Sequence, residues 1–357
     1  MDTSNVAEKS EELVTCYFDA IPAFVDHELA RLYEVLQSSL AFMQSFRELR
    51  EVNCYVASKD ETVKVVLLFV RSRRRVDVLN EMIELGETEI KRFAQYIFER
   101  LPDIDVIHFK AVRAELHQFP RPIQKQNSKH TYLIALPASI EKYNSSMSRK
   151  TMTGIRYQTN KAKKTFPSLS SRTYHDEEID EAHIIEIIRL SESRINSDDP
   201  SFSYDARAIC QLAKKCGFVH IIFIEGRVCA GTVNYRVGAS FFGEVLGQDP
   251  EYKKYGLGKI CVYQTICESI SRGGRKFYLG GGAFDFKTQL LGNLVEMDEI
   301  KIYRSRIGVL RQIDSALGTW WAGRVRRLKD LFHQHRRHII ARMVFKIFYF
   351  SRSKISR

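Results

Sequence analysis

The stretch that decides the fold reads SFFGEVLGQDPE (240–251), YKKYGLG (252–258), KICVYQTICESISRGG (259–274) and RKFYLGGG (275–282). Aromatic and β-branched residues at its start predict a strand, and apolar residues at helical spacing predict a helix over 259–272. Gly256 and Gly258 lie in the loop that joins them. A glycine loop lets an anion approach the unpaired backbone N–H groups at the positive end of a helix dipole. The sequence therefore predicts a phosphate-binding loop.

Composition limits what such a loop could serve. The chain has 357 residues, of which 44% are hydrophobic, so it is long enough for two domains with packed cores. Its net charge of +12 favours an anionic partner, which could be nucleic acid, a phosphorylated cofactor or a lipid surface. The seven cysteines form no CxxC pair, so the sequence predicts neither a zinc site nor a disulfide scaffold.

The chain carries no pattern typical of export or of a membrane span. The N-terminus MDTSNVAEKSEE is polar and acidic, and no run of about eighteen apolar residues occurs. A reducing compartment suits the unpaired cysteines. We therefore expect a cytoplasmic protein.

The order of predicted elements is mixed α and β. Residues 21–50 and 87–100 have helical periodicity, whereas 63–70 and 106–109 are predicted strands. The segment HQFPRPIQKQNSKH at 117–130 is polar and proline-bearing, and the strand-like YLIALP follows it. We place a domain boundary near Pro137, which gives an N-terminal α/β domain (1–136), a second domain (137–313) and a tail (314–357).

Two further patterns precede the glycine loop. The predicted helix over 149–164 is strongly basic, which is typical of a solvated helix face and also of a groove for a polyanion. Strands at 219–225 and 228–237 flank Gly226, which predicts a tight hairpin that leads into the strand at 240.

At this point the sequence resembles a known superfamily. The EGRVCAG turn, the strands GTVNYRVG and FFGEVLG, the glycine loop, the helix and GGRKFYLGGG resemble the C-terminal half of GNAT acyltransferases. More narrowly, DPEYKKYGLGKICVYQTICESISRGGRKFYLGGGAFDFKTQLLG (249–292) is similar to the acetyltransferase domain of CelD/BcsL-type proteins of cellulose and exopolysaccharide synthesis, which are related to FemAB aminoacyl transferases. LPASIEKYNSSMSRKTMTGIRYQTNKAKK (136–164) is similar to the element before that domain, and the likeness covers about 137–305.

The resemblance implies an α/β fold of tandem GNAT-like halves, each a mixed, mostly antiparallel sheet flanked by helices, with a degenerate N-terminal copy. It implies an N- or O-acyltransferase that uses acetyl-CoA or another acyl-CoA to modify a sugar or amine in exopolysaccharide or cell-envelope biosynthesis. Two alternatives stay open: a FemAB-like transferase supplied by aminoacyl-tRNA, and a catalytically silent scaffold of a polysaccharide synthase complex. The basic helix and the positive charge would suit the tRNA alternative.

The superfamily's acyl-CoA loop has Gln or Arg, two variable residues, Gly, one variable residue, then Gly or Ala. Here the first place is taken by Lys253, which departs from the pattern but keeps the charge. The pantetheine arm is expected between the strand of Glu244 and the strand of Phe277. The acyl-CoA contacts that the resemblance implies are Val245, Leu246, Lys253, Lys254, Tyr255, Gly256, Leu257, Gly258 and Lys259. The alternative is a loop whose glycines only form a turn.

Three residues are candidates for catalysis: Glu244, Asp285 and Lys287. Glu244, with apolar neighbours along its strand, could be a base with a raised pKa, or it could face the other way in a salt bridge. After the last strand the family commonly shows an acidic residue, Tyr-Lys and then a glycine. Asp285 and Lys287 match this pattern, whereas Phe286 replaces the tyrosine. A structural ion pair is the alternative role for Asp285 and Lys287.

The tail has a character of its own. Arginine and lysine alternate with apolar residues at helical spacing, as in helices that lie on anionic membranes. Peripheral docking at the inner membrane is one hypothesis, and packing on the protein's own core or on a second subunit is the other. His333, His335 and His338 lack a nearby set of carboxylates and cysteines, so we expect no metal site.

Overall fold

The computed structural model describes residues 12–196, 202–282 and 285–311, and the predicted tail lies outside them. The described residues group into two compact units. Unit 1 contains 12–43, 47–128 and 297–311, and unit 2 contains 44–46, 129–196, 202–282 and 285–296. The division of the chain into domains at 136/137 and 313/314 stays a prediction.

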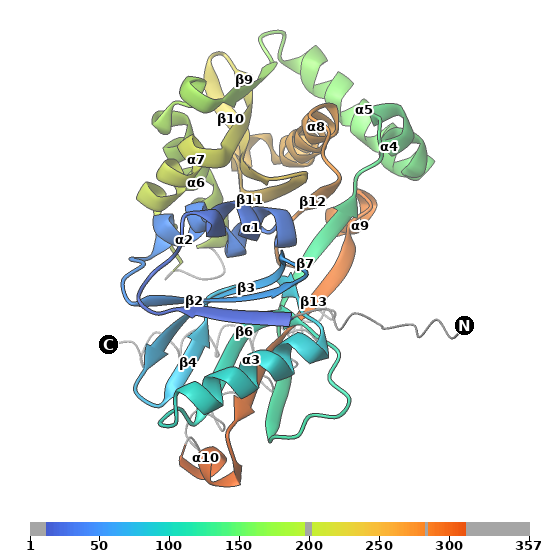
Figure 1. Ribbon diagram of the computed structural model, residues 1–357. Coiled ribbons are helices and arrows are strands. Elements are labelled where there is room, and N and C mark those ends of the chain that lie inside the picture. Colours follow the sequence, from blue (N-terminus) through green and yellow to red (C-terminus); the bar gives the residue numbers. More distant parts are fainter. Residues whose placement is uncertain (1–11, 197–201, 283–284, 312–357) are drawn as a thin grey trace, which may run out of the picture. The chain divides into compact units, whose positions relative to one another are not determined.

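The first part of the chain alternates strands and helices (Figure 1). In order, the elements are β1 (Glu12–Tyr17), α1 (Phe24–Tyr33), η1 (Leu36–Ser38), α2 (Leu40–Phe46), β2 (Val52–Lys59), β3 (Thr62–Ser72), β4 (Arg75–Val78), β5 (Ile83–Glu84), α3 (Glu87–Arg100) and β6 (Val106–Arg113).

The sheet of unit 1 has the order β1-β2-β3-β4-β6-β13, where β13 is Asn293–Tyr303. Neighbouring strands are antiparallel except β4 and β6, which are parallel. The apolar side of α3 packs on this sheet through Phe93, whose ring makes edge contacts with Phe69 at 5.7 Å and Phe109 at 5.9 Å. Edge-to-face aromatic contacts of this kind stabilise a core beyond their buried area.

The second part begins with a long strand and continues with helices and strands (Figure 1). The elements are β7 (Ile123–Ala135), α4 (Ile140–Ser146), α5 (Arg149–Thr165), β8 (Ser170–His175), η2 (Asp176–Glu178), α6 (Glu181–Ile195), α7 (Ala206–Cys216), β9 (Gly217–Ile224), β10 (Arg227–Val237), β11 (Ser240–Gln248), η3 (Pro250–Tyr255), α8 (Leu257–Ser271), β12 (Lys276–Tyr278), α9 (Asp285–Gln289), β13 and α10 (Arg306–Arg311).

The sheet of unit 2 has the order β7-β12-β11-β10-β9-β8. β11 and β12 are parallel, and the other pairs are antiparallel. Helices α4, α5 and α8 contribute to one core on this sheet through residues that include Tyr143, Ile155 and Ile266. Helices α6 and α7 contact β9, β10 and β11. The central strands are therefore enclosed by helices, and only their ends can open into a site.

The two units repeat one plan. Each has a strand, two helices, three antiparallel strands, a helix and a parallel strand: β1-α1-α2-β2-β3-β4-α3-β6 and β8-α6-α7-β9-β10-β11-α8-β12. The strand that completes each sheet is exchanged, because β13 pairs with β6 in unit 1 and β7 pairs with β12 in unit 2. The expected fold of tandem, mostly antiparallel GNAT-like halves is confirmed.

The local predictions fare differently. The β9–β10 hairpin is confirmed, and both of its turn residues, Glu225 and Gly226, have positive φ. The continuous helix over 21–50 is wrong, because α1 ends at Glu34 in a left-handed conformation. The polar segment 117–130 is strand over much of its length. β7 already begins at Ile123, and its polar residues are bonded, as when Gln126 donates to Glu299 at 3.0 Å.

None of the described helices combines the length and the apolar character that crossing a membrane requires.

Candidate functional site

The site begins where β11 and β12 separate. Their pairing runs through Phe241 with Phe277 and ends at Phe242 with Tyr278. The rings of this last pair stack with centroids 4.6 Å apart and an interplanar angle of 5°. Beyond it the two parallel strands share no backbone pairing, so a wedge opens between them. The strands of Glu244 and Phe277, between which the resemblance places the pantetheine arm, therefore separate at this point.

A bulge lies at the same level on the other edge of β11. Val233 of β10 pairs with Val245, whereas the next residue, Asn234, pairs with Gly243. Glu244 is thus the extra residue of a β-bulge on β11. Because a bulge bends its strand and increases the twist, it helps to turn the end of β11 away from β12.

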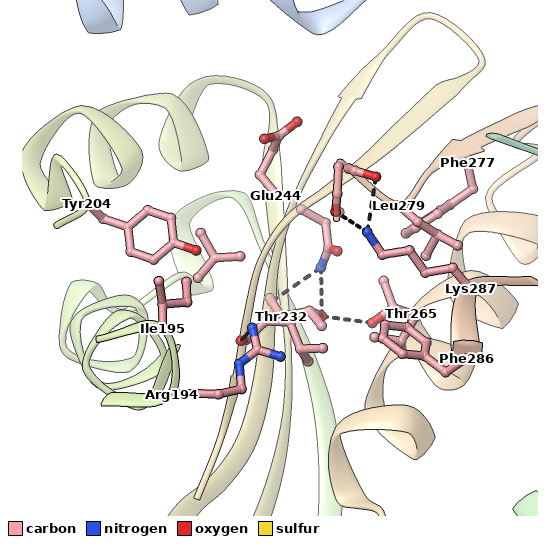
Figure 2. A pocket seen from close by; sticks show the side chains of 17 residues that line it. Arg194, Ile195, Tyr204, Thr232, Glu244, Thr265, Phe277, Leu279, Phe286 and Lys287 are labelled. Atoms are coloured by element: carbon pink, nitrogen blue, oxygen red, sulfur yellow. Dashed lines mark hydrogen bonds between the residues drawn. The ribbon is translucent and has the colours of Figure 1, made fainter. Parts of the chain in front are cut away.

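A cavity of about 370 Å³ occupies this wedge (Figure 2). Residues of β10, β11, α8 and α9 form its walls, together with β12 and the two glycines that follow it, the end of α6, and Tyr204. All of these residues belong to unit 2. Two of the three predicted catalytic residues, Glu244 and Lys287, line the cavity, as do Val245 and Leu246 from the predicted cofactor set.

Lys287 enters the cavity from α9 and is buried, with 4% of its surface exposed. Its amine donates to the main-chain oxygens of Gly280, at 3.0 Å, and Gly281 (Figure 2). It also lies 5.4 Å from the centre of the Tyr132 ring. The Lys287 amine is therefore held between the Tyr132 ring and the glycine turn that follows β12.

The surroundings of Lys287 favour its neutral form. Burial lowers the pKa of its amine to about 8, and the nearby positive charge of Arg194 acts in the same direction, whereas Glu244 opposes them. An amine with a pKa near 8 exchanges protons close to neutral pH, which is what general acid–base chemistry requires.

The other two catalytic candidates are less enclosed. Glu244 is exposed on the bulge, so the apolar surroundings expected for its carboxylate are not found. Asp285 is the exposed first residue of α9 and does not line the cavity, and its main-chain oxygen accepts a hydrogen bond from Thr288 Oγ1 at 2.9 Å. Their catalytic roles stay predictions.

The cavity also contains residues that sequence reasoning missed. Arg194, at the end of α6, donates to the main-chain oxygen of Leu246 at 3.5 Å. Tyr204 interacts with Ser191 Oγ at 3.2 Å, and burial raises the pKa of its phenol. In the view of Figure 2 Tyr204 lies to the left of Glu244, Arg194 lies below it, and Lys287 lies to its right. No motif marks Arg194 or Tyr204, because Arg194 reaches the cavity through the packing of α6 on β11 and Tyr204 through its contact with Ser191 of α6.

The glycine loop has the backbone that a tight approach needs. Gly256 has a φ of 65° and caps α8, whose first turn follows at once. A Cβ at Gly256 would lie 2.6 Å from Gln158 Oε1 of α5, a side-chain end that can move, so glycine is favoured there by its positive φ. The N–H of Gly258 donates to Gln248 Oε1 at 3.1 Å. A side-chain oxygen therefore already occupies one of the amides predicted to bind phosphate.

Basic helix α5 lies beside this loop. Its Phe166 end packs on Tyr252 and Tyr255 of η3 with centroids 5.4 and 5.0 Å apart. Lys161 and Lys254 both lie over the Tyr255 ring, at 5.6 and 5.2 Å. Lys161 and Lys254 are thus brought together beside Tyr255, just before the start of α8.

The repeated plan allows a comparison with unit 1. There α3 follows Gly86, which has an ordinary φ of −69°, and its first turn carries Glu87 and Glu89. The corresponding helix of unit 2, α8, follows a left-handed glycine and two lysines. Two carboxylates at a helix start oppose an anion, so of these two helix starts only that of α8 has the charge expected of a phosphate-binding loop.

Comparison with known proteins finds a family match in the same part of the chain. The model of the acetyltransferase (GNAT) domain matches residues 149–288. This part of the chain is therefore similar to a GNAT domain. It includes β8 to β12, the glycine loop and Lys287, and thus most of the cavity wall.

Solved structures extend the likeness beyond this domain. FemX is 8% identical with a TM-score of 0.55, over 81% of this chain and 96% of FemX. A conserved protein of unknown function from Bacteroides thetaiotaomicron is 12% identical with a TM-score of 0.53, over 81% of this chain and 100% of that chain. At these identities the likeness shows a shared fold. No curated protein matches the sequence significantly.

Proposed function

We propose that this protein transfers an acyl group from an acyl-CoA, with acetyl-CoA as the first candidate, to an amine or hydroxyl acceptor. The observation that carries the proposal is the cavity between the separating strands, which is lined by Glu244, Val245 and Leu246 of β11, the strand that the glycine loop follows in the chain. From Gly243 to Gln248 an extended strand covers on the order of 16 Å. A long, thin ligand with an anionic end suits a site of this shape.

The two ends of the site differ in charge, which orients the ligand. The diphosphate is expected at the N-terminus of α8, where the backbone of Gly258 and the ammonium groups of Lys253 and Lys254 favour an anion. The pantetheine arm then follows β11 past Leu246 and Val245. This brings the thioester to the apex of the wedge, beside Lys287.

The reaction requires one proton acceptor. The nucleophilic nitrogen or oxygen of the acceptor attacks the thioester carbon, the carbon–sulfur bond breaks, and the nucleophile's proton has to leave. With a pKa of about 8, roughly a tenth of Lys287 is neutral at pH 7 and can take that proton. The thiolate leaves as CoA and is protonated in turn. Glu244 at the bulge supplies a negative charge that attracts a cationic acceptor.

The acceptor is proposed from the motif resemblance. The segment 249–292 is similar to acetyltransferase domains of exopolysaccharide synthesis, so a sugar or amine used in exopolysaccharide or cell-envelope production is our first choice. This places the enzyme in the cytoplasm, with docking of the tail at the inner membrane as a further part of the proposal.

Titration calorimetry with CoA, acetyl-CoA and desulfo-CoA tests the proposal. We expect binding of all three to the wild type and its loss in Gly258→Glu, because a carboxylate would enter the diphosphate site. Gly86→Glu is the matched control, since it adds the same charge before the corresponding helix α3, where a Cβ meets nothing within 4 Å. If the wild type binds none of these ligands, the proposal is wrong.

Helix α5 supports one second candidate, a transferase supplied by aminoacyl-tRNA. Its sequence RKTMTGIRYQTNKAKKT carries six cations and no acidic residue, and Tyr157 among them is 65% exposed. Exposed cations with an aromatic ring suit a phosphodiester chain with accessible bases. Filter binding of aminoacyl-tRNA, with affinity falling steeply as salt rises, combined with no heat from CoA, would favour this candidate.

A further inference from the structure

Asn234 of β10 is completely buried, and its side-chain oxygen is a hydrogen-bond acceptor that no donor of the described residues reaches. None of its surface is exposed, and it lines the cavity at the apex of the wedge. Its Nδ2 donates to the main-chain oxygens of Thr232 at 3.2 Å and Phe218 at 3.4 Å, and to Thr232 Oγ1 at 2.9 Å. Its Oδ1 has no hydrogen-bond partner among the described residues.

The orientation of the Asn234 amide is fixed by its partners. Main-chain oxygens can only accept hydrogen bonds, so the nitrogen has to face Thr232 and Phe218, and the oxygen has to point the other way. The hydroxyl of Thr232 is held in turn by Thr265 Oγ1 at 2.8 Å, which also donates to the Cys261 carbonyl at 2.9 Å. This buried network anchors Asn234 to α8 and leaves little freedom for the side chain to turn.

The free oxygen lies next to the cavity. Gly243 pairs directly with Asn234 across the strands and also lines the cavity. A Cβ added at Gly243 would lie 3.5 Å from Asn234 Oδ1 and 3.2 Å from Cε1 of Phe277. The absence of a side chain at Gly243 therefore keeps the space in front of the oxygen open. A buried acceptor without a donor costs free energy. A ligand that places an N–H group in front of Asn234 Oδ1 would remove this cost.

We propose that Asn234 Oδ1 accepts a hydrogen bond from an amide N–H of the acyl-carrying arm of CoA. The inference rests on the proposed function and adds to it a specific contact near the reacting end. The arm is the part of the ligand that carries amide groups, and it has to pass Gly243 to bring the thioester to Lys287. Asn234 is thus a positioning residue, which sets how far the thioester advances into the wedge.

The test compares CoA with 3′-phosphoadenosine 5′-diphosphate, which keeps the anionic end and lacks the arm. We expect Asn234→Leu to weaken CoA about tenfold, the size of one lost hydrogen bond, and to leave the affinity for the fragment unchanged. Gly243→Ala should do the same by filling the space before the oxygen. Ser269→Ala is the control, because it removes another buried hydrogen bond, to the Thr265 carbonyl at 2.9 Å, away from the cavity lining.

Thermal denaturation of each variant separates loss of fold from loss of contact. If Asn234→Leu does not fold, Gly243→Ala alone decides the question. Wild-type affinity for CoA in a folded variant overturns the inference and indicates that water satisfies Asn234. Equal weakening of CoA and fragment overturns it as well, since the effect then does not depend on the arm. If the wild type binds neither ligand, the proposed function fails first and this inference fails with it.

Discussion

Lys287 donates from its amine to the main-chain oxygen of Gly280 at 3.0 Å, and this contact holds a residue of α9 at the turn that follows β12. A neutral amine can keep two such donations, to Gly280 and Gly281, and still has a lone pair. Lys287 therefore does not have to release the turn in order to act as a base.

We expect kcat/KM for acyl transfer to rise with pH through an apparent pKa of about 8, because the neutral amine of Lys287 is the active form and burial lowers its pKa to that value. In the Lys287→Arg variant the rise of kcat/KM with pH should disappear, because a guanidinium stays charged. Its kcat should fall about a hundredfold. Lys276→Met, at an exposed position of β12, is the control. A purely structural Lys287 would leave the pH profile of the arginine variant unchanged.

A second prediction concerns Gln248, whose Oε1 accepts the Gly258 N–H at 3.1 Å. Its Nε2 is buried without a partner among the described residues. A diphosphate that uses the Gly258 amide has to displace this side chain, at a cost of about 1 kcal/mol. We therefore expect Gln248→Ala to bind CoA about fivefold more tightly in calorimetry. Weaker binding would contradict this and would indicate that Nε2 donates to the phosphate.

The stability of unit 1 should depend on pH through His108. It pairs with Asp77 of the neighbouring strand, and its two ring nitrogens lie 2.9 Å from carboxylate oxygens of Asp77 and Glu299. Burial opposes the charged ring, but these hydrogen bonds outweigh burial and raise the pKa of His108. Burial also opposes ionised Glu299, yet the bonds from His108 and Gln126 lower its pKa to about 2. Arg75 and Lys301 are the neighbouring cations.

These pKa shifts determine how the free energy of unfolding changes with pH. The His108 contribution is complete below its usual pKa of 6.5 and is lost as pH rises through the raised value. The Glu299 contribution is complete above 4.5 and is lost as pH falls towards 2. Urea denaturation should therefore show His108→Gln destabilised by roughly 2 kcal/mol at pH 6 and by less at pH 9. His117→Gln, an exposed site, is the control, and equal losses at both pH values would contradict the argument.

The sequence predicts the strand, loop, helix and strand of 240–282 because their signals are local: period-two and helical spacing, and glycine where φ is positive. It also predicts that Glu244 and Lys287 lie near one cavity, through motif order along the chain. It does not predict the exchange of β7 and β13, since pairing partners distant in sequence leave no local pattern. Arg194 and Asn234 are missed for the same reason, because only packing brings them to the wedge.

The repeated plan leads to a last prediction, on stoichiometry. Two units with the same strand order could in principle offer two wedges, yet the helix starts differ in charge. Lys253 and Lys254 lie in the last turn of η3, just before α8, whereas the first turn of α3 carries Glu87 and Glu89. Carboxylates in a first helical turn compensate the dipole themselves and repel a diphosphate. Calorimetry should therefore find one CoA per chain, and Gly258→Glu should abolish all of the heat. A stoichiometry of two, or residual binding of CoA in that variant, would show that unit 1 has kept a working site despite its acidic helix start.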